Sequence, residues 1–211
     1  MKFISFSRFV LISIFPLLVF LLVLNFTAFD QNFYEEKFSE YDVAIEEPVT
    51  LHQKVIDFIR GYSKEPPDLF NAKEKQHLLD VRDVVKLLSI ILYVLMAIFI
   101  LLLIASLAIL KVNNKMTNFV GKVMMFGGIL TVILAVVIFI LLNLGFSSAF
   151  ESFHKLFFEP GTYSFEPSES LVRLYPEQIF MDIGFRMSGL VLIFSALAAL
   201  LGFYIAKPKR K

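Results

Sequence analysis

The sequence predicts an α-helical membrane protein: four spanning helices in a bundle, carrying a small mixed extracellular cap with short β-strands. Hydrophobic residues make up 57% of the chain, and the mean hydropathy is +0.73. A soluble domain of this size could not remain in solution with that composition. Four uncharged apolar runs stand out, and about 20 helical residues at ~1.5 Å per residue cross a ~30 Å hydrocarbon core.

The four runs are predicted to be the spans of a single membrane domain comprising residues 1–211. They cover residues 9–29, 87–110, 123–146 and 187–206. Lys2 and Arg8 precede the first run, as in a signal peptide, but this run is too long for one. Phe26 and Asp30 near its end provide no small-residue cleavage site, so we interpret it as a retained helix.

Charge alternates between the connecting segments, although the formal net charge is only +1. Basic residues lie at the start of the chain, between the second and third spans, and in the tail: Lys2, Arg8, Lys111, Lys115, Lys122, Lys207, Lys209, Arg210 and Lys211. By the positive-inside rule these segments, and so both termini, are cytoplasmic. The segments 30–86 and 147–186 are rich in Asp and Glu and are predicted to be extracellular. The charge pattern thus determines topology and does not indicate a nucleic-acid partner.

The two outer segments are predicted to fold into the cap. Alternating residues predict short strands at 41–45, 49–51, 163–165 and 171–175. Residues 55–59 predict a short amphipathic helix that ends at Gly61. His52 beside this helix is expected to be a solvated surface residue.

The sequence excludes several kinds of chemistry. It has no cysteine, so thiol nucleophiles, disulfides and Cys-ligated zinc are absent. It also lacks a Gly-x-Ser-x-Gly elbow, a Walker loop and a dinucleotide-binding glycine motif.

One histidine is predicted on a helix that begins before the second apolar run. Asn71 is a plausible N-cap, and no helix breaker follows it. Glu74, His77 and Asp80 then lie on one face at a spacing of three residues. His77 is therefore expected between two carboxylates.

A second histidine, His154, is predicted on an outward extension of the third span that ends at Pro160 and Gly161. The short loop between the second and third spans predicts a helical hairpin. A straight rise of ~1.5 Å per residue raises His77 about 15 Å and His154 about 12 Å beyond the apolar runs. The two histidines are thus expected at nearly the same height. Spacing alone leaves three interpretations open: ordinary interfacial histidines, a proton-transfer pair, or a metal site with Asp80 and Glu151.

The residues around both histidines resemble a known family. The matching stretches are Glu74-x-x-His77-Leu78-x-Asp80-Val81-Arg82, Phe153-His154-x-Leu156-Phe157-Phe158, Phe165-x-Pro167 and Leu174-x-Pro176-x-x-x-Phe180. With the four spans, they resemble the lipoprotein intramolecular transacylases of Gram-positive bacteria.

The resemblance implies an acyltransferase of the bacterial plasma membrane whose active site lies at the extracellular face. It implies transfer of an acyl chain from the sn-2 oxygen of a diacylglyceryl group to the α-amine of a lipoprotein's N-terminal cysteine. His77 and His154 would be the catalytic residues, one as base and one as acid, without a metal or cofactor. The expected partners are diacylglyceryl-modified lipoproteins and membrane lipids.

Five further residues are predicted to support the pair: Glu74, Asp80, Arg82, Tyr163 and Arg173. Glu74 or Asp80 would orient His77, and Arg82, Tyr163 or Arg173 would donate to the oxyanion. Two other hypotheses remain: a non-catalytic membrane protein that binds a partner through its acidic outer segments, and a metal-dependent membrane hydrolase.

Overall fold

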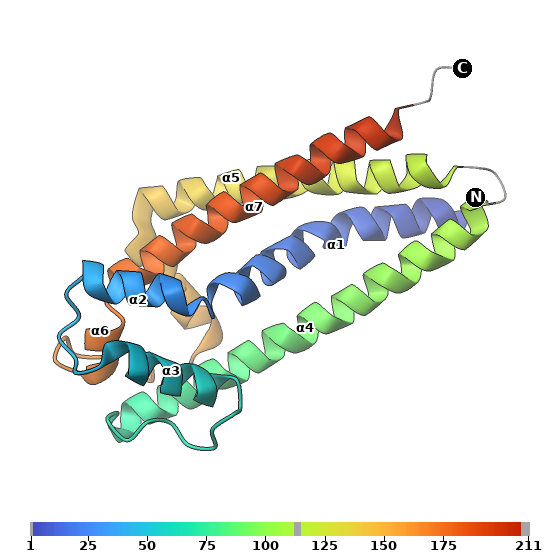
Figure 1. Cartoon of the computed structure of the whole chain (residues 1–211). Helices are drawn as coiled ribbons and strands as arrows, with labels where there is room; N and C mark the ends of the chain where they lie inside the picture. The colour runs from blue at the N-terminus through green and yellow to red at the C-terminus, as the bar shows by residue number, and fades with distance from the viewer. Residues whose placement is uncertain (1, 112–114, 208–211) are drawn as a thin grey trace. The chain divides into compact units, whose positions relative to one another are not determined.

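The computed structural model describes residues 2–111 and 115–207, and all regular elements in this part of the chain are helices (Figure 1). Four are long: α1 (Lys2–Thr27), α4 (Ala72–Leu110), α5 (Met116–Phe157) and α7 (Glu177–Ala206). Three are short: α2 (Gln31–Glu40), α3 (Pro48–Ile59) and α6 (Ser170–Leu174). By length and composition, these 4 are the helices of the described residues that could cross a membrane, which confirms the predicted number of spans. Lys209, Arg210 and Lys211 of the predicted basic tail lie outside the described residues.

The predicted β-strands of the cap are wrong, because no strand occurs in residues 2–111 or 115–207. Residues 49–51 belong to α3, which Pro48 begins with a φ angle that suits a first helical position. Residues 171–174 belong to α6, whose buried Leu171 and Leu174 have the spacing of a helical face. The stretches 41–45 and 163–165 are irregular. Short apolar runs do not distinguish strand from helix, and here the helical spacing prevails.

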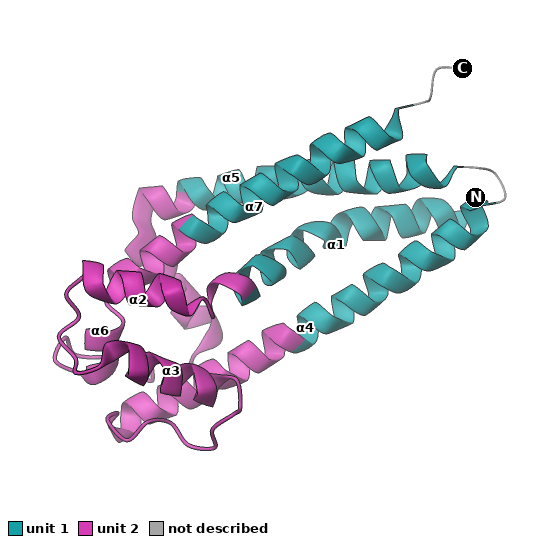
Figure 2. Ribbon diagram, viewed as in Figure 1, with its two compact units in different colours: residues 1–25, 90–140, 186–211 teal, residues 26–89, 141–185 magenta. Residues whose placement is uncertain are grey.

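The chain divides into two compact units (Figure 2). Unit 1 contains residues 1–25, 90–140 and 186–211, and unit 2 contains residues 26–89 and 141–185. Each long helix contributes residues to both units. The amphipathic helix predicted at 55–59 is the second half of α3 and lies in unit 2.

In unit 1, helices α5 and α7 approach each other at glycines. A Cβ atom built on Gly202 would lie only 2.4 Å from the backbone nitrogen of Met125 and 2.6 Å from the carbonyl oxygen of Gly121. A Cβ atom on Gly128 would lie 2.6 Å from the carbonyl oxygen of Ser195. Small residues at membrane helix contacts allow backbones to pack directly, and packing is a main source of stability in lipid.

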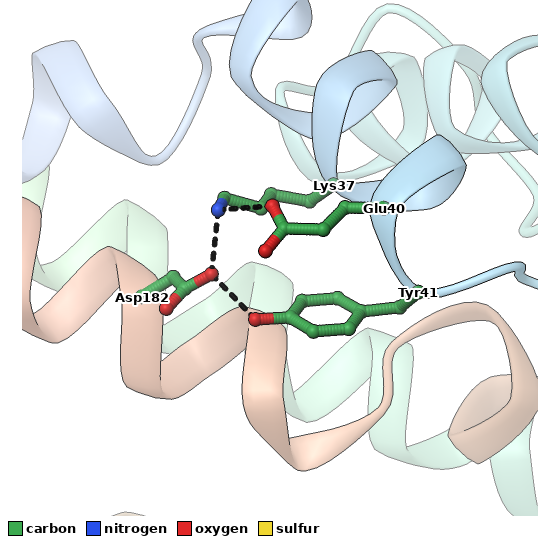
Figure 3. Close-up of polar contacts among 4 residues, drawn as sticks. All are labelled: Lys37, Glu40, Tyr41 and Asp182. Atoms are coloured by element: carbon green, nitrogen blue, oxygen red, sulfur yellow. Dashed lines mark hydrogen bonds and ion pairs between the residues drawn. The ribbon is translucent and has the colours of Figure 1, made fainter.

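Unit 2 has an apolar core built from all three short helices and from parts of α4 and α7. Its buried members are Phe33, Tyr34, Phe38, Leu51, Val55, Phe58, Phe70, Leu78, Leu171, Leu174 and Ile179. A polar network on α2 reinforces this core (Figure 3). Asp182 of α7 accepts a hydrogen bond from the Tyr41 hydroxyl at 2.7 Å and pairs with the Lys37 ammonium at 2.8 Å, while Lys37 also pairs with Glu40 at 2.6 Å. The network fixes α2 to the N-terminal part of α7.

Candidate active site

The first turn of α4 is closed by reciprocal hydrogen bonds between Asn71 and Glu74. The Asn71 side-chain oxygen accepts from the Glu74 amide at 3.0 Å, and Glu74 Oε2 accepts from the Asn71 amide at 2.8 Å. This arrangement is a capping box with Asn71 as N-cap, which confirms the predicted helix start. The other carboxylate oxygen of Glu74, Oε1, accepts from the amide of Leu171 at 2.6 Å. Because Leu171 belongs to α6, this bond joins the start of α4 to α6. The Glu74 side chain is buried at this junction, with 1% exposed.

His77 lies one turn further along α4, before the apolar run 87–110, and is buried among aromatic rings. Its ring centroid lies 4.8 Å from that of Phe158 and 5.3 Å from that of Phe165. Its Nδ1 atom is buried and has no hydrogen-bond partner among the described residues. Burial lowers the pKa of His77 to about 4, and the nearby His154 lowers it as well, whereas Asp80 raises it. His77 is therefore uncharged at neutral pH.

Helix α5 is kinked at Gly145, whose backbone angles (φ −178°, ψ 72°) are not helical. The chain then resumes the helix and carries His154 in its last turn. His154 Nδ1 lies 2.7 Å from the carbonyl oxygen of Phe150, four residues earlier. A carbonyl only accepts, so Nδ1 holds the hydrogen and donates it. In the neutral ring, Nε2 therefore carries the lone pair.

The two histidines meet, with their ring centroids 6.1 Å apart and their planes inclined by 20°. The sequence predicted that the two histidines lie at nearly the same height, and the structure places their rings side by side. The predicted straight extension of the third span is wrong, because α5 is not straight. The kink at Gly145 redirects the C-terminal part of α5. Two stacked imidazoles of this kind offer an acceptor, the lone pair on Nε2 of His154, beside a ring N–H donor on the uncharged His77, which is the arrangement that general acid–base chemistry requires.

A loop at residues 158–169, between α5 and α6, contacts both histidines. Phe158 is buried beside both rings, with its centroid 4.8 Å from that of His77 and 5.5 Å from that of His154. Tyr163 lies 5.3 Å from His154, and Phe165 lies 5.3 Å from His77. Of the predicted oxyanion donors, Tyr163 is therefore the one that contacts a histidine.

The remaining predicted supporting residues lie in different surroundings. Arg82 stacks its guanidinium over the Phe58 ring of α3 at 5.0 Å, and Arg173 donates to the carbonyl of Ala44. Asp80 is close enough to influence the pKa of His77, but its Oδ1 accepts from Gln76 at 2.9 Å. Both oxygens of Glu74 bind backbone amides, so the prediction that Glu74 orients His77 has no support in these contacts.

The expectation that His52 is a solvated surface residue is wrong, because it is 1% exposed. Its Nδ1 lies 2.8 Å from the Tyr175 hydroxyl, and its ring lies 4.0 Å from that of Tyr34. Burial lowers its pKa to about 4. His52 is next to Leu51 and three residues before Val55 on the buried face of α3, a spacing that could have indicated burial. It belongs to the core of unit 2.

The metal-site interpretation finds no support in the geometry. Within the described ranges, no three His, Asp or Glu side chains are grouped closely enough to hold a metal ion. Glu151 pairs instead with Lys155 at 2.6 Å.

The four long apolar helices define a multi-pass membrane protein in which two histidines lie side by side, and comparison with known proteins identifies its family. The model of the family "Lipoprotein intramolecular transacylase Lit" matches residues 7–180. The chain therefore belongs to the lipoprotein intramolecular transacylase family and is an acyltransferase. No curated protein matches by sequence.

Solved structures share the fold. The membrane integral lipoprotein intramolecular transacylase from Bacillus cereus superposes with a TM-score of 0.77 at 19% identity, covering 96% of this chain and 95% of that one. A variant of the Bacillus cereus protein with one histidine replaced by alanine gives a TM-score of 0.75 at 17% identity, covering 96% of this chain and 93% of the other.

Proposed function

We propose that this acyltransferase moves an acyl chain within a diacylglyceryl-modified lipoprotein, from the sn-2 oxygen of the glyceryl group to the α-amine of the N-terminal cysteine. The family supplies the reaction class. The observation that carries the proposal is the contact between His77 and His154, with ring centroids 6.1 Å apart and Nδ1 of His154 hydrogen-bonded to the carbonyl of Phe150. Both reacting groups belong to one substrate, so the enzyme needs only to fix their geometry and move protons.

His154 is the base in this proposal. A lipoprotein α-amine has an ordinary pKa near 7.7 to 8 and must lose a proton to attack an ester. Nε2 of His154 takes that proton, and the Phe150 carbonyl stabilises the resulting imidazolium through Nδ1–H. The amine nitrogen bonds to the ester carbon, the bond from that carbon to the glyceryl oxygen breaks, and the proton passes to this oxygen. An ester becomes an amide and a hydroxyl, with nothing else consumed.

His77 acts as a neutral partner. Because its pKa is low, it is a poor base but can donate a ring N–H to the oxyanion or the departing glyceryl oxygen. The Tyr163 hydroxyl, on a ring that contacts His154, is a second candidate donor. Asp80 acts only through its charge on His77, and Arg82, Arg173 and Glu74 act through the fold.

The proposed topology has both termini in the cytoplasm and the segments 30–86 and 147–186 on the extracellular side. Lys111, Lys115 and Lys122 flank the short connection between α4 and α5, which supports a cytoplasmic location by the positive-inside rule. The histidine pair then faces the outer leaflet of a bacterial plasma membrane. Lipoproteins and membrane lipids are the partners, and no nucleic acid takes part.

Mass spectrometry of a purified diacylglyceryl lipopeptide incubated with the protein tests the proposal. The expected product has the same mass as the substrate and carries the acyl chain on nitrogen, as fragmentation reveals. His154→Ala and His77→Ala should each lower the rate by about 100-fold or more, in line with the loss of general acid–base catalysis. Two neighbouring residues serve as matched controls: Lys155→Ala for His154 and Gln76→Ala for His77. Both variants should keep the wild-type rate.

An unchanged lipopeptide with the wild-type protein would refute the proposed reaction. Full activity in both histidine variants, with both proteins folded, would favour a partner-binding role for the pair. Loss of the reaction with a chelator and its return with added metal would favour the metal-dependent alternative.

A further inference from the structure

The loop 158–169 is held against the first turn of α4 by polar contacts that the sequence did not indicate. The Asn71 side-chain amide donates to Glu169 Oε1 at 2.9 Å, and Lys73 Nζ donates to the carbonyl of Ser164. Glu169 Oε2 in turn accepts from the amide of Glu166 at 2.6 Å. These bonds hold the pKa of Glu169 below its usual range, so the carboxylate is charged. The loop that contacts both histidines is therefore fixed from α4.

Of the α4 residues that hold this loop, Lys73 contacts the ring that packs on His77. Its ammonium lies 5.0 Å from the centroid of the Phe165 ring, and the Phe165 ring lies 5.3 Å from that of His77. Lys73 and His77 are four residues apart on α4, so one helix turn presents both to the same loop. A cation at the second residue of a helix is disfavoured by the helix dipole. The carbonyl of Ser164 and the face of Phe165 compensate this placement.

We propose that Lys73 is a positioning residue: it fixes the loop 158–169 so that Phe165 closes over His77 and holds its ring against His154. This role rests on the proposed function of the histidine pair and extends it to a residue outside that pair. Lys73 does not touch the reacting atoms; it acts through Phe165. Removing it leaves the chain and both histidines in place but loosens one wall of the site.

Steady-state rates on the diacylglyceryl lipopeptide test this role with variants of Lys73 and Phe165. Lys73→Met should lower kcat by about 10-fold, because small displacements from reactive geometry are costly. Lys73→Arg should restore most of the rate, because a guanidinium also donates to a carbonyl and stacks on a ring. Lys75→Met is the matched control: Lys75 lies on the same turn, pairs with the exposed Asp68 at 3.5 Å and should keep wild-type kcat.

A double-mutant cycle shows whether Lys73 acts through Phe165. Phe165→Ala should also lower kcat, and adding Lys73→Met to it should cause less than a twofold further loss, since two residues in one chain of contacts are not additive. Independent losses that multiply would overturn the proposal, as would wild-type kcat in Lys73→Met or an equal loss in Lys75→Met.

Hydrogen exchange separates this proposal from the proposed function. Lys73→Met should speed exchange of the amides in residues 162–166, while Lys75→Met should not. Faster exchange with unchanged kcat would overturn the positioning role and leave the catalytic histidines untouched. Conversely, full activity in His77→Ala and His154→Ala would refute the proposed catalytic role of the pair, whatever Lys73 does to the loop.

Discussion

Replacement of Glu74 by glutamine separates a structural role from a catalytic one. The carboxylate accepts from the amides of Asn71 and Leu171 at 2.8 and 2.6 Å. A glutamine has one acceptor oxygen and no charge, so it retains one of these bonds in weaker form. A hydrogen bond to a charged group contributes about 1.5 to 3 kcal/mol. Glu74→Gln should therefore lower the free energy of unfolding by about 2 kcal/mol.

Thermal unfolding of the detergent-solubilised protein and the rate on a diacylglyceryl lipopeptide are measured together. A loss of about 2 kcal/mol lowers the Tm of a chain of this size by roughly 4 to 8 °C. Well below the Tm, kcat of Glu74→Gln should remain within about threefold of wild type, because no contact links Glu74 to the reacting atoms. Glu159→Gln, at an exposed position, is the matched control and should change neither quantity. A large fall in kcat with an unchanged Tm would refute the capping role and favour orientation of His77.

Two further predictions concern packing and pH. Gly202→Ala should destabilise unit 1 by about 2 kcal/mol, since its Cβ meets backbone atoms at 2.4 and 2.6 Å, whereas Gly189→Ala on the same helix, with nothing within 4 Å, should keep or raise the Tm. Burial gives His52 a folded-state pKa of about 4, against an ordinary value of 6.5. Its contribution to the free energy of unfolding is therefore complete above pH 6.5. Between pH 6.5 and pH 4 only the unfolded state gains a proton, so this contribution is lost as the pH falls. The free energy of unfolding should fall by about 3 kcal/mol across this pH window. His52→Gln should flatten the Tm–pH curve in this window, and an unchanged slope would contradict the assignment.

The spans were predictable because hydrocarbon demands a long, uncharged apolar run, and this demand is local in sequence. The helix start at Asn71 was predictable for the same reason, since a capping box joins residues three apart. Of the short helices of the cap, only the second half of α3 was predicted, because the secondary structure of the other short segments depends on packing with distant segments. Leu171, for example, is fixed by Glu74, which lies 97 residues earlier.

The histidine pair was predicted through a geometry that proved only partly correct. Equal heights followed from two straight helices, whereas α5 turns at Gly145 before it reaches His154. A glycine within an apolar run gives no direction for a kink, so the sequence could not supply the orientation of the segment that follows Gly145. The contact itself was predicted, since His77 of α4 and His154 of α5 lie side by side, and the rings of Phe158 and Phe165 determine how His77 is enclosed.

The first turn of α4 links the stability of the cap to the proposed catalytic site. Asn71 and Glu74 close the helix, Lys73 reaches the loop 158–169, and His77 follows one turn later. A substitution in this turn can therefore lower activity either by unfolding the cap or by displacing a ring from His77. The two causes differ in temperature dependence: partial unfolding lowers the rate only near the Tm, whereas displacement lowers kcat at every temperature. Rates measured well below the Tm of each variant thus determine which of these residues serve the reaction and which serve the fold.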